Sequence, residues 1–280
     1  MEKNHYKRNY HEWPLERMAK TLKKVLKLKG EPIALAWGME PPYGLKPYTG
    51  KLELPHCQYM QRSRFNGETF VLSLESMYQG CSGFSYMGLS DPDPTLKTGY
   101  LHSRNPQGMP GIFGTPGASR RCLQYYHWIE PGTVKYFSCS PLSKCPFDPD
   151  VVTIIGDAKQ CTYAIRAAIY YRGGVVTGQV GPGVDSDSWG AAYLTGEIKF
   201  TLGSHGSFGA MGLQPYEIAL SFPLEWLPET CANLEEWVER GKPMFHETPA
   251  EEDEWLKAPY EGPYKWRSGK SAYELREEQE

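Results

Sequence analysis

Several features that would place a protein in a special class are missing from this sequence. No apolar run approaches the roughly 20 residues that a helix needs to cross a bilayer. The N-terminus is polar and lacks the hydrophobic segment of a signal peptide, and the net charge is only −3. We therefore expect a soluble, cytoplasmic protein that binds neither membranes nor nucleic acid.

The sequence also has little of what usually identifies a catalytic or metal site. Its seven cysteines are scattered, odd in number and include no Cys-x-x-Cys pair. Such cysteines make a poor disulfide framework and indicate a reducing compartment. No Walker motif, Gly-x-Ser-x-Gly elbow or His-Glu-x-x-His pair is present. The sequence alone therefore names no reaction.

What is present indicates an ordinary globular chain with an internal repeat. Short apolar runs alternate with helical patterns, which predicts an α/β fold, with mixed α+β as the alternative. A β–α–β order would allow parallel strands joined by a crossover. We expect four regions: an N-terminal basic helix at 1–30, a first repeat at 31–147, a second repeat at 148–245 and an aromatic, acidic arm at 246–280.

The repeat rests on elements that recur in the same order. An apolar strand at 32–37 returns at 151–156, and a Cys-x-Tyr-x-x-Arg pattern opens a helix at Cys57 and again at Cys161. Each half then has a second strand and ends in a strand followed by Pro-Leu. This order indicates two diverged copies of one unit, packed as a single pseudo-two-fold body. A ligand at the centre would be held by matching groups of both copies.

The cysteines of this repeat suggest a metal site. Cys57 matches Cys161, and Cys81 falls opposite Asp185, so a pseudo-axis could gather three thiols and one carboxylate. Thiolates are the ligands that iron–sulfur clusters and other soft transition-metal centres need. The open alternatives are that no cofactor is bound and these cysteines only fill the core, or that Cys57, at a helix start beside His56, is a nucleophile.

Other side chains could bind a small-molecule ligand near such a centre. They come from the paired helices and from a glycine-rich segment at 203–209: His56, Tyr59, Arg62, Tyr163, Arg166 and His205. The residues 90–131 predict a long loop that could cover the site. Arginines in this loop (Arg104, Arg120 and Arg121) could clamp an anion.

The order of several segments resembles a known family. These segments are residues 29–35, Cys57, residues 80–83, and the run 181–187 continuing to 194–197. They resemble the domain of unknown function 169 family, an archaeal conserved region group, over roughly residues 20–235. The family often has cysteine at the positions of Cys57 and Cys81, and often a further cysteine where this chain has Asp185. It is frequent in anaerobes and archaea and has no settled reaction.

Three hypotheses for function follow. The first is an enzyme or redox-linked protein of anaerobic-type metabolism, binding a small organic ligand or a metal or iron–sulfur cofactor between the repeats. The second is a non-catalytic accessory subunit whose basic helix and aromatic arm dock on a partner. The third is a metal-free enzyme acting on a phenolic or carboxylate substrate. A homo-oligomer or a partner subunit is expected.

Overall fold

The structure is a computed structural model that describes residues 13–50, 54–78, 81–103 and 112–241. The chain divides into two compact units, Met1–Glu236 and Trp237–Glu280. The sheet and the pocket described below belong to the first unit. The predicted arm at 246–280 and the first twelve residues of the predicted N-terminal region lie outside the described residues. Within those residues, no helix has the length and apolar character needed to cross a membrane.

The described part of the chain contains a seven-stranded sheet and eight α-helices, together with short 3-10 and π-helical turns. The strands are β1 Ile33–Gly38, β2 Phe70–Leu72, β3 Tyr136–Pro141, β4 Val151–Gly156, β5 Thr177–Gly178, β6 Lys199–Thr201 and β7 Ile218–Pro223. The helices are α1 Leu15–Leu26, α2 His56–Asn66, α3 Gly83–Tyr86, α4 Pro94–Lys97, α5 Pro116–Leu123, α6 Ala158–Ile169, α7 Gly190–Thr195 and α8 Leu227–Glu239. Four turns matter below: η3 Leu142–Lys144, η4 Asp185–Trp189, η5 Ser207–Met211 and η6 Leu224–Trp226.

The sheet is mixed, which confirms the predicted α/β class. Its strand order is β2-β3-β1-β4-β7-β6-β5, and every neighbouring pair is antiparallel except β5–β6. The expectation of parallel β–α–β pairing was therefore wrong for the centre of the sheet. A parallel pair needs a crossover from one strand to its neighbour. Here the chain leaves β1 through α2 and β2, and the strand that returns beside β1 is the antiparallel β3.

The strand order is the same on both sides of the central β1–β4 pair. Outward from the centre, it is β1, β3, β2 on one side and β4, β7, β6 on the other. The register also agrees, because Ile33 lies opposite Pro141 in the first set and Val151 lies opposite Pro223 in the second. Each proline ends its strand and is followed directly by a 3-10 turn, η3 or η6.

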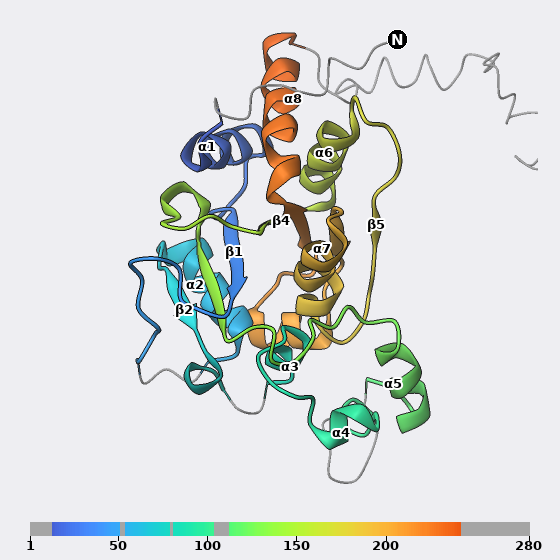
Figure 1. Ribbon diagram of the computed structural model, residues 1–280. Coiled ribbons are helices and arrows are strands. Elements are labelled where there is room, and N and C mark those ends of the chain that lie inside the picture. Colours follow the sequence, from blue (N-terminus) through green and yellow to red (C-terminus); the bar gives the residue numbers. More distant parts are fainter. Residues whose placement is uncertain (1–12, 51–53, 79–80, 104–111, 242–280) are drawn as a thin grey trace, which may run out of the picture. The chain divides into compact units, whose positions relative to one another are not determined.

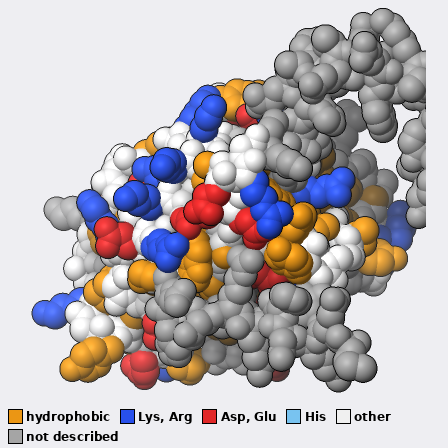
Figure 2. Space-filling model, turned by 90° about the horizontal axis from the view of Figure 1, so that it is seen from above, with side chains coloured by type: hydrophobic (Ala, Val, Ile, Leu, Met, Phe, Trp, Pro, Cys, Tyr) orange, Lys and Arg blue, Asp and Glu red, His pale blue; other side chains and the backbone are white. Residues whose placement is uncertain are grey.

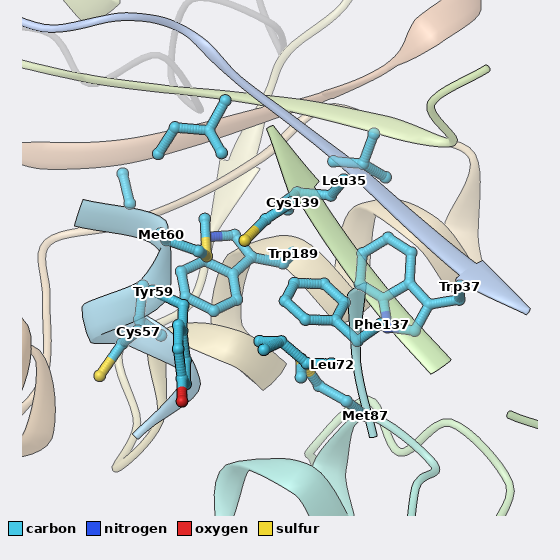
Figure 3. Packing of buried hydrophobic residues seen from close by; sticks show 14 of the residues in the cluster. Leu35, Trp37, Cys57, Tyr59, Met60, Leu72, Met87, Phe137, Cys139 and Trp189 are labelled. Atoms are coloured by element: carbon cyan, nitrogen blue, oxygen red, sulfur yellow. The ribbon is translucent and has the colours of Figure 1, made fainter. Parts of the chain in front are cut away.

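One face of the sheet packs on α2 and η4. Because strand side chains alternate between faces, Leu35 and Trp37 of β1 point to the same side, where they join a buried cluster with Tyr59 and Met60 of α2. Trp189 of η4 is fully buried in the same cluster. Figure 3 shows these side chains converging between the strands and α2. This core fixes the N-terminal ends of α2 and η4, which carry the residues of the pocket.

The other face is covered by α1, α6 and α8, which Figure 1 shows grouped at the top of the view. A side chain at Gly156, which points away from the first core, would meet Gln160 of α6 and Leu28. α8 is joined to α6 by the side-chain amide of Asn233, which donates to the carbonyl of Ala167 at 2.8 Å. The helices α2 and α6 therefore lie on opposite faces of the sheet.

The outer surface of this helical layer carries charges of both signs. In Figure 2, which looks down on it, lysine and arginine side chains alternate with carboxylates. Arg17 of α1 pairs with Glu235 of α8 at 2.9 Å, and Lys23 pairs with Glu31. Exposed pairs of this kind add little stability each, so the layer is held mainly by its buried apolar residues.

The predicted loop at 90–131 has structure of its own in its described residues. Asp93 caps α4 by accepting from the backbone of Thr95, and Thr115 caps α5 by accepting from the backbone of Ala118. Leu96 of α4 and Leu123 of α5 share a small buried cluster with Tyr86 and Tyr126. The loop prediction missed these helices because they have only four and eight residues and are stabilised by their caps and by tertiary packing.

Candidate functional site

A pocket of about 200 Å³ lies where the N-terminal ends of α2 and η4 approach each other. Segments from both halves of the chain line it. The lining residues are 55–57, 81–83, 182–185 and 204–207, with Tyr78, Tyr86, His102, Ile112 and Ala210. Its lining includes thiol, imidazole, carboxyl and phenol groups, all able to react or to transfer protons. A larger hollow of about 620 Å³ near Trp37 and Asp148 has no thiol–imidazole pair.

Local backbone chemistry explains why the two segments begin here. Pro55 stands at the N-cap of α2 with φ of −56° and ψ of 142°, so the helix starts at His56. Its lack of an N–H costs nothing there, because the N–H groups at a helix start have no partner within the helix. Gly83 is needed because a β-carbon there would overlap the His56 ring and the Asp185 carboxylate. Gly183 is similarly closed in by Asp185 and Tyr86. The absence of side chains at these two glycines lets the two ends of the pocket meet.

Three side chains form a line at the centre of the pocket. The Sγ atom of Cys81 lies 3.4 Å from Nδ1 of His56. On the other side of the ring, Nε2 of His56 lies 3.6 Å from Oδ2 of Asp185. His56 and Asp185 are each 3% exposed, and neither of these two facing atoms has a hydrogen-bond partner among the described residues. The arrangement is thiol, imidazole and carboxylate in sequence.

The charges of this line stabilise one another. Burial lowers the pKa of His56, but the adjacent Cys81 and Asp185 raise it by more, so the net direction is upward. Burial raises the pKa of Asp185, and the nearby imidazole offsets part of that rise. Burial also raises the pKa of Cys57 strongly, which keeps that thiol protonated. The imidazole is thus suited to hold a proton beside Cys81, whereas Cys57 is a buried neutral thiol.

A second polar pair lines the same pocket. The hydroxyl of Tyr86 and Nε2 of His102 are 3.0 Å apart, and both residues are at least nine-tenths buried. Burial raises the pKa of Tyr86 well above its ordinary value and lowers the pKa of His102 to about 4. Both groups are therefore neutral at pH 7. Nδ1 of His102 has no hydrogen-bond partner in the described part of the chain.

Five predicted site residues line this pocket: Cys57, Cys81, Asp185, His56 and His205. Cys161 does not. Cys161 lies on α6, and its Sγ is 3.8 Å from the carbonyl oxygen of Gly156 and 3.8 Å from that of Ile218. The predicted set of four metal ligands is therefore not assembled, because α6 packs on the opposite face from α2. Within the described residues, no group of three or more His, Cys, Asp or Glu side chains is arranged to hold a metal ion.

The other predicted ligand-binding residues have structural contacts elsewhere. The hydroxyl of Tyr59 donates to the carbonyl of Ser76 at 2.9 Å, and Arg62 makes a two-pronged pair with Glu68 at 2.9 and 2.7 Å. On α6, Tyr163 is half-buried beside Lys159, and Arg166 is exposed. None of these four predicted residues belongs to the pocket lining.

Two arginines of the predicted clamp do not line the pocket. Arg120 and Arg121 are exposed on α5, and Arg104 lies outside the described residues. The segment 90–131 nevertheless contributes His102 and Ile112 to the lining.

Sequence reasoning missed Tyr86, His102, Ser204 and Ser207. One signal could have found part of this set. The tripeptide Met-Gly-Leu occurs twice, at 87–89 and at 211–213, and each copy follows a segment that lines the pocket. Aligning the halves on this tripeptide would have matched the segment at Cys81 with the segment at Ser204.

Comparisons with known proteins place the chain in a family without assigning a reaction. An uncharacterised protein of Methanocaldococcus jannaschii is 26% identical over 188 residues, which cover 65% of this chain and 77% of that protein. No solved structure matches the chain. The family model of DUF169, described as uncharacterised ArCR, matches residues 21–233. That range is most of the 280 residues and agrees with the resemblance seen in the sequence, so the chain belongs to the DUF169 family.

Proposed function

We propose that this protein is an enzyme that uses Cys81 as a nucleophile on a small organic substrate bound between the two halves of the chain. One observation carries the proposal: the pocket lining contains a thiol, an imidazole and a carboxylate in line, at 3.4 and 3.6 Å. A nucleophile within reach of a base that a third group orients is the general pattern of covalent catalysis. The pattern is recognised by geometry and is independent of fold.

Each member of the line has a separate role. Nδ1 of His56 takes the proton of the Cys81 thiol, which leaves a thiolate. Asp185, on the Nε2 side of the ring, stabilises the imidazolium and fixes its orientation. The ring is also held edge-on against Trp189, with centroids 5.5 Å apart and planes at 87°. The imidazole therefore has little freedom to turn away from the thiol.

The chemistry balances for an acyl substrate. The sulfur of Cys81 bonds to the electrophilic carbon, the bond from that carbon to its leaving group breaks, and His56 returns its proton to the leaving atom. A water molecule then attacks the S-acyl intermediate while His56 takes its proton. Breaking of the carbon–sulfur bond and return of that proton regenerate the thiol. No oxidant or reductant is required.

The second part of the proposal is that the pocket lies on the axis of an internal duplication. The matched strand registers on the two sides of the β1–β4 pair support this idea. The connections from helix to strand also support it. Gly67 ends α2 three positions before β2 starts, and Gly196 ends α7 three positions before β6 starts. Both glycines have left-handed backbone, with φ of 73° and 65°.

In this alignment His56 corresponds to Asp185, because each stands eleven positions before its glycine. The duplicated Met-Gly-Leu tripeptide extends the match, since Gly88 and Gly212 have φ of 78° and 72°. Cys81 then corresponds to Ser204, with one extra residue in the second copy. The contacts between the two halves agree with this alignment as well, because α2 contacts η5 and η4 contacts α3.

The duplication therefore pairs different residues from those that the Cys-x-Tyr-x-x-Arg pattern suggested. Cys57 corresponds to Ser186 in this alignment, and α6, with Cys161, is an insertion of the second half. Two copies of one helix start have diverged into the base, His56, and the group that orients it, Asp185. A pocket on an axis of this kind offers each ligand groups from both halves.

A metal or iron–sulfur cofactor is the alternative proposal for the same pocket. Its support is that Cys57, Cys81, His56 and Asp185 all belong to the lining. These groups would hold a metal through thiolate and imidazole ligands. Elemental analysis of protein purified without oxygen separates the two proposals. One bound metal per chain in the wild type, lost in Cys81→Ser, would favour the cofactor.

Thiol alkylation tests the proposed nucleophile. Metal-free protein is treated with iodoacetamide at pH 7, and the modification of each cysteine is followed by peptide mass spectrometry. Cys81 is expected to react fastest, and His56→Gln to slow it by about 100-fold, the usual contribution of a positioned base. Cys57→Ser is the matched control and leaves the rate at Cys81 unchanged. Equal rates at Cys81 in the wild type and His56→Gln would refute the proposal and favour a non-catalytic role.

A further inference from the structure

The charge of the pocket limits what can enter it. Its described lining contains no lysine or arginine. Of the three arginines predicted to bind an anion, Arg120 and Arg121 are exposed on α5, outside the lining, and Arg104 lies outside the described residues. The His56 ring, which takes up a proton in the proposed mechanism, lies between Cys81 and Asp185, at 3.4 and 3.6 Å. Among the described lining residues, an anionic substrate would find no lysine or arginine to replace its hydration, which is costly at a buried site.

Two of the polar groups left for a ligand form a neutral pair. Tyr86 and His102 are both uncharged at pH 7, for the reasons given above. Ser82 is a second hydrogen-bond partner of Tyr86. When His102 and Ser82 both donate to the Tyr86 oxygen, the Tyr86 hydroxyl proton is left to donate to a ligand. Neutral donors of this kind match a carbonyl oxygen, whereas carboxylates and phosphates are usually bound by arginine or lysine.

The rest of the lining is mostly apolar. Pro55, Ile112, Pro182, Val184 and Ala210 contribute to its walls. Such walls favour an uncharged hydrocarbon body, and a few placed polar groups then set its orientation.

We infer that the substrate is a small uncharged carbonyl compound, such as a neutral amide, ester or thioester, whose oxygen is bound by Tyr86. This inference rests on the proposed function, since it takes Cys81 as the attacking group. The Tyr86 hydroxyl would stabilise the negative charge that develops on the carbonyl oxygen as the thiolate attacks. His102 acts through Tyr86 by fixing the direction of its hydroxyl, so His102 is a positioning residue.

Two reagents of nearly equal size and different charge test the inference. Iodoacetamide carries a neutral amide and iodoacetate carries a carboxylate, and both alkylate thiolates. The rate ratio of the amide to the acid is measured at Cys81 and, as a reference, on N-acetylcysteine. The ratio at Cys81 is expected to exceed the reference by about 10-fold or more, the effect of one unmatched buried charge. Tyr86→Phe should lower the iodoacetamide rate and leave the iodoacetate rate nearly unchanged.

The outcomes separate this inference from the proposed function. A ratio equal to or below the reference, with Cys81 still reacting fastest, would overturn the uncharged substrate alone. Slow reaction of Cys81 with both reagents would overturn the nucleophile itself. Tyr43→Phe is the control for Tyr86→Phe, because Tyr43 is fully exposed and lies outside the pocket. It should change neither rate, and far-ultraviolet circular dichroism shows whether the Tyr86 variant keeps its fold.

Discussion

His56 is the first residue of α2 and Asp185 is the first residue of η4, and their side chains meet with Nε2 and Oδ2 3.6 Å apart. They are 129 positions apart in the sequence, so their approach depends on the whole sheet between them. The packing that brings these helix starts together makes predictions of its own, independent of any substrate.

Gly83 should not tolerate a side chain. A β-carbon there would overlap His56 and Asp185, and both are buried with little room to move. We expect Gly83→Ala to lower the free energy of unfolding by about 1–3 kcal/mol, as overpacking of a core usually does. Urea denaturation followed by tryptophan fluorescence measures the change. Gly209→Ala is the matched control, since a β-carbon at Gly209 meets nothing within 4 Å; equal stability of both variants would contradict the packing described.

The two halves are also joined by a buried ion pair. Arg64, at the end of α2, donates to Glu217 at 2.6 Å and to the carbonyl of Ile155 at 3.2 Å. The two side chains are 2% and 5% exposed. We expect Arg64→Met to cost about 3–5 kcal/mol of unfolding free energy, because it leaves the Glu217 carboxylate buried without its cation.

A second arginine on α2 provides the comparison. Arg62 pairs with Glu68, but both side chains are one-third exposed. Arg62→Met should therefore cost no more than about 1 kcal/mol. Denaturant titration of both variants under the same conditions decides the matter. If Arg64→Met lowers the unfolding free energy as little as Arg62→Met does, the Arg64–Glu217 pair is not buried from water as it is in the structure.

The class of the fold and the family could be predicted from sequence, because both depend on patterns that are local. The apolar runs at 32–37 and 151–156 are strands β1 and β4 in the structure, within a residue at each end. Which strands pair was not visible, since an apolar run reads the same whether its neighbour is parallel or antiparallel. The antiparallel return of β3 beside β1 follows from tertiary packing.

The site could be predicted in part. His56, Cys57, Cys81 and Asp185 were identified as residue types able to carry chemistry, and they do meet in one pocket. Cys161 was predicted to join them because both helices start with Cys-x-Tyr-x-x-Arg. Two unrelated helices can share this pattern, since it specifies only three of six residues. Helix α6 follows β4 directly and packs on the other face of the sheet, so the match of α2 with α6 was misleading. The duplication that we propose instead aligns α2 with η4 and α7, through the glycines that end α2 and α7.

The buried carboxyl of Asp187 should make stability depend on pH. Burial raises the pKa of Asp187 to about 7. One of its oxygens accepts from the backbone of Gly181 at 2.6 Å, and the other has no partner in the described part of the chain. Asp187 is therefore protonated in the folded state over a range in which the unfolded chain has lost that proton.

The sign follows from proton linkage. Between the unfolded pKa of about 3.9 and the folded value, the folded state binds more protons, so this residue makes stability fall as pH rises. The slope from this residue is at most about 1.4 kcal/mol per pH unit. Asp187→Asn should remove that part of the slope between about pH 4 and 7, measured as unfolding free energy in urea. An unchanged difference between pH 5 and 7 in this variant would contradict the buried, protonated carboxyl.

The acid–base coupling of Cys81 and His56 is tested most directly by the titration of the His56 ring, followed by NMR and assigned by comparison with His56→Gln. The neighbouring thiol raises the pKa of His56 against the effect of burial. In Cys81→Ser this contribution is lost while the burial remains, so the account predicts that the His56 pKa falls, whereas Cys57→Ser leaves it in place. The same His56 pKa in the wild type and in Cys81→Ser would contradict the thiol–imidazole pair on which the proposed function rests.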